Sequence, residues 1–67
     1  MRREQKFHIT FRKASKARDY AFSQDFQGEV SWHTDNIISV VTWKRKNIQR
    51  MKYLAGIYGA IAIRKVS

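Results

Sequence analysis

Hydrophobic and polar residues alternate strictly over residues 6–12. Phe7, Ile9 and Phe11 fall on one side of an extended chain, and the polar residues between them fall on the other. This alternation is typical of a strand that buries one of its faces. We therefore predict a first strand over residues 6–12, with these three apolar side chains in the core.

A helix is predicted over the next residues, 13–26. Its alanines recur at helical spacing and form one apolar stripe, made by Ala14, Ala17 and Ala21. Ser15 is a candidate N-cap, because a serine hydroxyl accepts a hydrogen bond from the first turn of a helix. Phe22 and Phe26 lie off the stripe, and Gly28 fits a break after the helix.

Two further strands are predicted in the middle of the chain. Residues 29–34 alternate again, with Val30 and Trp32 on one side and His33 on the other. Residues 37–43 are rich in β-branched residues and nearly apolar on both sides, which suits a central strand. We expect Trp32 to anchor the core.

The last part of the chain predicts a second helix and a final strand. Asn47 is a candidate N-cap, and Gly59 is a natural C-terminal stop. Between them apolar residues recur at helical spacing, at Ile48, Met51, Ala55 and Tyr58. Residues 60–67 then form a last short strand.

The predicted order is therefore strand, helix, strand, strand, helix, strand. This is the β-α-β-β-α-β order of ferredoxin-like folds, in the α+β class. Right-handed crossovers place the strands in the order 4-1-3-2, with both helices on one face of an antiparallel sheet. An alternative keeps three strands and one helix, followed by a longer C-terminal helix from residue 47 to about residue 63. We expect residues 1–67 to form one compact domain, with residues 1–5 as a basic N-terminal arm.

Composition narrows the classes of function. The chain has 67 residues, a length at which folding buries only about 60% of the surface of the unfolded chain. Hydrophobic residues make up 43%, too many for a disordered basic tail. The absence of cysteine excludes disulfides, Cys-based zinc sites and a catalytic cysteine. The most apolar run, residues 53–63, would span roughly 16 Å as a helix, so we expect a cytoplasmic protein with no membrane partner.

Catalytic and metal-binding chemistry finds little support in the sequence. The acidic residues are scattered rather than paired as general acid–base work requires. His8 and His33 lack the spacing of metal ligands, and we expect them on the open face of the sheet, separated by the third strand and exposed. We therefore expect no enzyme activity, no metal and no cofactor.

Charge is segregated along the sequence. Lys and Arg number 14 against 5 Asp and Glu, a formal net charge of +9. Residues 1–18 hold seven basic residues and one acid, residues 19–43 hold four acids and no Lys or Arg, and residues 44–67 hold seven basic residues and no acid. The predicted fold gathers much of the positive charge at one end of the sheet, tempered by Glu4 and Asp25. The residues of this predicted basic pole are Arg2, Arg3, Lys6, Lys44, Arg45, Lys46, Arg64 and Lys65.

Further candidate binding residues flank the basic pole or lie opposite it. Arg50 and Lys52 would extend it along the second helix, and Trp43 is a candidate for stacking on a base. A second basic run, at the start of the first helix, consists of Arg12, Lys13, Lys16 and Arg18. Cations at a helix N-terminus oppose the helix dipole, and a bound polyanion would reverse that cost.

Two classes of function remain open. The leading hypothesis is a small non-enzymatic protein that binds DNA or RNA through phosphates, with little base specificity. The alternative is an inhibitor or adaptor of the type made by phages and mobile elements, docking on an acidic surface of a host enzyme or defence complex. Excess charge that only keeps a small domain monomeric is the competing structural interpretation. A homodimer through the edge that carries Ile61 and Ile63 also stays open.

Overall fold

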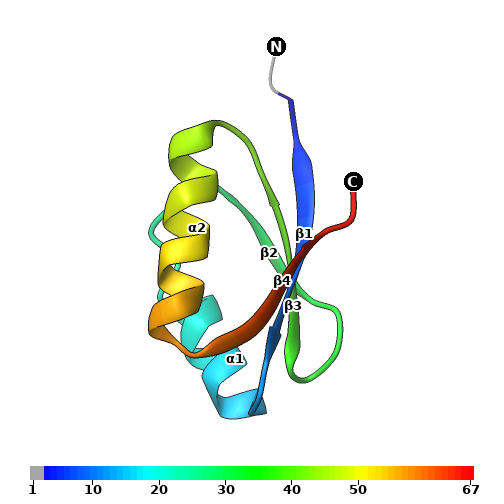
Figure 1. Ribbon diagram of the computed structural model, residues 1–67, viewed down its shortest axis with the longest axis vertical. Coiled ribbons are helices and arrows are strands. Elements are labelled where there is room, and N and C mark those ends of the chain that lie inside the picture. Colours follow the sequence, from blue (N-terminus) through cyan, green and yellow to red (C-terminus); the bar gives the residue numbers. More distant parts are fainter. Residues whose placement is uncertain (1–2) are drawn as a thin grey trace.

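The computed structural model describes residues 3–67, which form a four-stranded antiparallel sheet with both helices on one face (Figure 1). The strand order is β2-β3-β1-β4, so the predicted ferredoxin-like order is confirmed. The alternative C-terminal helix is wrong, because its last residues form a strand paired with β1. The elements are β1 (Gln5–Phe11), α1 (Ala14–Phe22), β2 (Gly28–Trp32), β3 (Ile37–Thr42), α2 (Arg45–Ile57) and β4 (Ala60–Lys65).

The first strand lies at the centre of the sheet. Phe7 is opposite Val40 of β3 on one side and Lys65 of β4 on the other. Phe7, Ile9 and Phe11 are buried beneath the helices, as their alternation predicts. Of the predicted N-terminal arm, Gln5 already belongs to β1, and residues 1–2 lie outside the described residues.

The core joins the two helices to the helix-facing side of the sheet. Met51, Leu54 and Ala55 of α2 are buried in it, with Ile48 and Tyr58 packed against them. Tyr20 of α1 is fully buried, and its hydroxyl donates a 3.2 Å hydrogen bond to the Met51 carbonyl. Burial raises the pKa of Tyr20, so the hydroxyl keeps the proton that it donates. No helix within residues 3–67 is long and apolar enough to cross a membrane.

The first helix and the loop after it differ from the prediction in three places. Lys13 is the N-cap residue and Ser15 lies within α1, so no side chain caps the helix. α1 ends at Phe22, which stays 83% exposed, whereas Phe26 enters the core. Gly28 does not mark a break but begins β2, where a β-carbon would lie 2.8 Å from a backbone oxygen of β3. The short loop is therefore fixed by close packing.

The prediction that Trp32 anchors the core is wrong. Trp32 is opposite the buried Ile38 on the helix-facing side, but it is 52% exposed. β2 is an edge strand, and even Val30 in its middle is only half-buried. The strand ends at Trp32, so His33 lies just beyond it.

The second helix begins earlier than predicted. Its N-cap residue is Lys44, and Asn47 lies within α2 as a buried side chain. There Asn47 Nδ2 donates to the Trp43 carbonyl at 2.8 Å, and Asn47 Oδ1 accepts a hydrogen bond from the Gln27 amide at 3.3 Å. Asn47 thus ties the loop before β2 to the start of α2. Gly59, at φ +80°, follows the helix as the predicted stop.

Candidate nucleic-acid interface

The start of β1, the start of α2 and the end of β4 lie at the same end of the molecule (Figure 1). The register explains this, because Gln5 is opposite Thr42, just before Lys44, and Phe7 is opposite Lys65. The sheet therefore brings together the predicted basic residues near these positions. Those within the described residues are Arg3, Lys6, Lys44, Arg45, Lys46, Arg64 and Lys65, while Arg2 lies outside them.

Three consecutive cations surround the N-terminus of α2. Lys44, Arg45 and Lys46 are all exposed, and we call them the α2-end cluster. The first turn has no acidic residue and no side-chain cap. The partial positive charge of a helix N-terminus disfavours a neighbouring cation by roughly 0.3–1 kcal/mol each. The cluster thus weakens the folded state and attracts anions.

Lys44 also has an unusual backbone conformation. Its φ of 71° and ψ of 137° lie in a region close to one that only glycine occupies readily. It is the one residue other than glycine with a positive φ in the part of the chain that the structure describes. Such a conformation costs of order 1–3 kcal/mol. Glycine would therefore adopt the backbone conformation of this position at lower cost than the lysine that occupies it.

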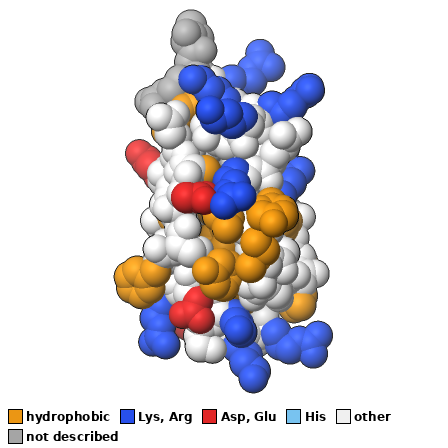
Figure 2. All heavy atoms as spheres, turned by 90° about the vertical axis from the view of Figure 1, so that its left-hand side faces the viewer, with side chains coloured by type: hydrophobic (Ala, Val, Ile, Leu, Met, Phe, Trp, Pro, Cys, Tyr) orange, Lys and Arg blue, Asp and Glu red, His pale blue; other side chains and the backbone are white. Residues whose placement is uncertain are grey.

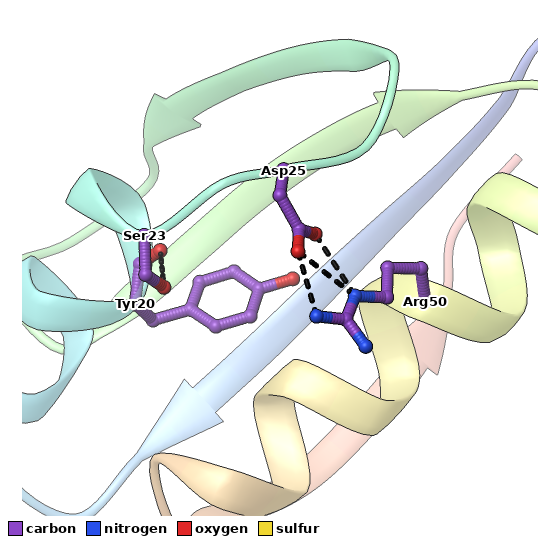
Figure 3. A network of polar contacts seen from close by, with 4 residues as sticks. All are labelled: Tyr20, Ser23, Asp25 and Arg50. Carbon is purple, nitrogen blue, oxygen red and sulfur yellow. Dashed lines mark hydrogen bonds and ion pairs between the residues drawn. The ribbon is translucent and has the colours of Figure 1, made fainter.

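A hollow of about 520 Å³ opens beside the α2-end cluster. The one carboxylate in it, from Asp25, is held by Arg50 through contacts of 2.7 and 3.0 Å (Figure 3). The hydrogen bond from Arg50 lowers the pKa of Asp25, so the carboxylate stays ionised and paired. The residues that line the hollow are Asp25, Phe26, Gln27, Lys44, Lys46 and Asn47.

Arg50 and Lys52 do not resemble the α2-end cluster. Arg50 forms the only ion pair within residues 3–67 and also lies 5.2 Å from the centroid of the Tyr53 ring. Lys52 lies on another side of α2, with its ammonium 6.0 Å from the centroid of the Phe7 ring. Trp43, half-buried, directly precedes the cluster. Among the predicted site residues that the structure describes, Arg50 is therefore the one whose charge is already matched by a carboxylate.

The second basic run lies at the other end of the molecule, at the start of α1. Lys13 is its N-cap residue, again with no side-chain cap and no acid in the first turn. Figure 2 shows Lys and Arg side chains gathered at both ends of the helical face, with apolar side chains between them. The exposed apolar side chains of the two helices are Phe22, Tyr53 and Ile57. The second run consists of Arg12, Lys13, Lys16 and Arg18, which we call the α1-end cluster.

The open face of the sheet holds a feature that the sequence analysis missed. The rings of His8 and His33 stack with centroids 4.2 Å apart and an interplanar angle of 27°. They were expected to be separated by β3, but they meet over it, where Ser39 is only 6% exposed. Burial, His33, Lys6 and Arg64 all lower the pKa of His8. The alternation correctly placed both rings on this face, but their contact was not predicted, and His8 is half-buried rather than exposed.

Neither metal-ligand clusters nor known relatives add to this picture. No group of three or more His, Cys, Asp or Glu residues able to hold a metal ion occurs within residues 3–67. A scan against protein-family models, a search of curated proteins and a search of solved structures each found no match.

Proposed function

We propose that this protein is a small non-enzymatic nucleic-acid-binding domain that contacts phosphates through the α2-end cluster. The observation that supports this proposal most directly is the uncapped N-terminus of α2 with Lys44, Arg45 and Lys46 around it. Backbone N–H groups and the helix dipole attract an anion there, and three cations add to that attraction. An acid or a capping side chain would serve folding better.

The ion-pair pattern supports a polyanion rather than a single small anion. Apart from Arg50, no Lys or Arg in the described part of the chain pairs with a carboxylate. The cations continue from the α2-end cluster to Arg3 and Lys65 nearby. About five neutralised phosphates would make log affinity fall with log salt at a slope near −4 to −5. Phosphate contacts of this kind carry little base specificity.

A salt titration with matched variants tests the proposal. The α2-end variant replaces Lys44, Arg45 and Lys46 by Ala, and the control replaces Lys13, Lys16 and Arg18 of the α1-end cluster by Ala. Both lose three positive charges, so a difference between them reports position rather than net charge. We expect the α2-end variant to bind a labelled generic duplex and single strand more weakly and with a shallower salt slope. Equal losses in both variants, or no binding by the unaltered protein at about 50 mM salt, would contradict the proposal.

Exposed apolar side chains of the two helices favour a second candidate function. Phe22, Tyr53 and Ile57 are 83%, 60% and 58% exposed on the helical face. An apolar centre with a charged rim is typical of protein interfaces, and here the rim would suit an acidic partner. In that case a few apolar residues would dominate binding as hot spots. Tyr53→Ala would then abolish capture of an acidic protein partner, whereas it should leave a phosphate contact at the start of α2 intact.

A further inference from the structure

The open face of the sheet carries its own set of groups suited to a nucleic acid. The register places Lys6 and His8 of β1 on this face, with Arg64 directly opposite His8 on β4. Its neighbouring positions on β3 and β4 are small or aliphatic, such as Ser39 and Ala62. The only acid on this face among the paired positions of the four strands is Glu29, opposite Val41 at the far side. The strand positions around the two rings are thus cationic, small or aliphatic.

The two imidazoles form a ready-made stack rather than a metal site. His8 is half-buried and His33 is exposed, with ring centroids 4.2 Å apart. Nε2 of His8 is inaccessible to solvent and has no hydrogen-bond partner within residues 3–67. The pair is therefore held by ring contact and not by polar pairing. His8 is thus the inner ring of the stack and the exposed His33 the outer ring.

We propose that the His8–His33 stack is a platform for one base of a single-stranded nucleic acid, whose flanking phosphates are held by Lys6 and Arg64. This inference rests on the proposed function and specifies a single-stranded rather than a duplex nucleic acid as the ligand. Histidine is among the side chains on which splayed-out bases stack in single-strand recognition. Lys6 lies two positions from His8 on the same face of β1 and Arg64 is directly opposite His8 on β4, so both cations lie beside the platform. A duplex keeps its bases stacked inside and offers none to His33.

The same geometry makes binding depend on pH. Among the paired strand positions, the charged groups on this face are Lys6 from β1, Arg64 from β4 and, at the far side, Glu29 from β2, whereas β3 contributes none. Asp35 lies in the loop that follows His33. Burial, the neighbouring imidazole of His33 and the two cations disfavour protonation of His8 in the free protein. Bound phosphates offset these cations and raise the pKa of His8, so binding takes up a proton. Affinity should therefore rise as pH falls, by at most about tenfold per pH unit for one proton.

The test compares three variants with two probes. The probes are a fluorescein-labelled oligothymidylate of about 12 nucleotides, within the site size of one small domain, and a duplex of the same length. His33→Ala should weaken binding of the oligothymidylate about 5- to 150-fold, the range for one lost base stack, and leave the duplex unaffected. His33→Phe should restore the affinity, because phenylalanine keeps a ring at the outer position of the stack. The matched control is Trp32→Ala, which removes an exposed ring from the helix-facing side of the sheet and should change neither.

Several outcomes would overturn the platform. Equal binding of both probes, with no effect of His33→Ala, would contradict the platform. It would leave the proposed function intact, provided that the α2-end variant binds both probes more weakly. A loss with Trp32→Ala as large as with His33→Ala would also contradict it. Heparin or polyglutamate that binds the open face as strongly as the oligothymidylate, unaffected by His33→Ala, would assign the surface to polyanions or acidic proteins in general. Failure of both probes to bind would overturn both proposals.

Discussion

Replacement of Lys44 by glycine should stabilise the fold and weaken phosphate binding at once. Lys44 occupies φ 71° and ψ 137° as the N-cap residue of α2. Glycine adopts such a conformation without a β-carbon clash, and it also removes one cation from the positive end of the helix. Lys44→Gly therefore separates the effect of Lys44 on the stability of the fold from the effect of its charge on phosphate binding.

The expected stabilisation follows from three opposing effects. Relief of the backbone conformation contributes about 1–3 kcal/mol, and removal of the cation from the helix N-terminus about 0.3–1 kcal/mol. The greater freedom of glycine in the unfolded chain takes back about 0.5–1 kcal/mol. The net increase in the free energy of unfolding should be about 2 kcal/mol, within a range of roughly 0.3–3.5 kcal/mol. For a domain of this size that corresponds to a rise in Tm of roughly 5–15 °C.

Urea denaturation followed by circular dichroism measures this change, with Lys44→Ala as the comparison. The alanine variant loses the same charge but keeps a β-carbon, so it should gain no more than about 1 kcal/mol. An unchanged m-value would show that the denatured state is unaffected. If the glycine variant were no more stable than the alanine variant, the conclusion that the backbone of Lys44 is strained would be refuted.

Three further predictions concern the packing of the helices and the loop between α1 and β2. Tyr20→Phe should cost about 0.5–1.5 kcal/mol in urea denaturation, because it removes a buried hydrogen bond to a carbonyl of α2. Arg50 lowers the pKa of Asp25 in the folded state, so the ionised carboxylate should stabilise the fold at neutral pH. This stabilisation should fade as the pH falls below about 4. The difference in stability between the unaltered protein and Asp25→Asn should therefore vanish at low pH. Gly28→Ala should destabilise the fold by about 1–3 kcal/mol, because the new β-carbon would meet a backbone oxygen of β3 at 2.8 Å, whereas Gly56→Ala, with open space around it within α2, should raise the Tm.

The strands and their order could be predicted because their side chains alternate or are continuously apolar. Phe7, Ile9 and Phe11 alternate with polar residues, and the nearly uniform apolarity of residues 37–43 marked the strand that became central. Helix capping could not be predicted in the same way. Ser15 and Asn47 are residue types that favour N-caps, but the chain begins both helices at lysines and uses Asn47 to link two loops instead.

The sequence predicted where the basic residues of the candidate site gather, but not which side chains contact one another. The register brought the basic residues to one end of the sheet, as the strand order required. The contact between Arg50 and Asp25 joins α2 to a loop 25 positions earlier, and no local pattern encodes it. Trp32 shows the same limit, because alternation gives the side of the sheet but not how far the helices extend over an edge strand. The histidine stack joins β1 to the residue just after β2, and no local alternation encodes a contact between these two segments.

The central place of β1 has a consequence for how the chain folds. Phe7 pairs with Val40 on one side and with Lys65 on the other, so the first strand finds both of its partners late in the sequence. Contacts between distant segments require closure of long loops before they contribute, which slows folding of small domains. During synthesis, the apolar residues of β1 must wait until β3 and then β4 have left the ribosome. Premature release before β4 would leave β1 as an unpaired edge, open to aggregation.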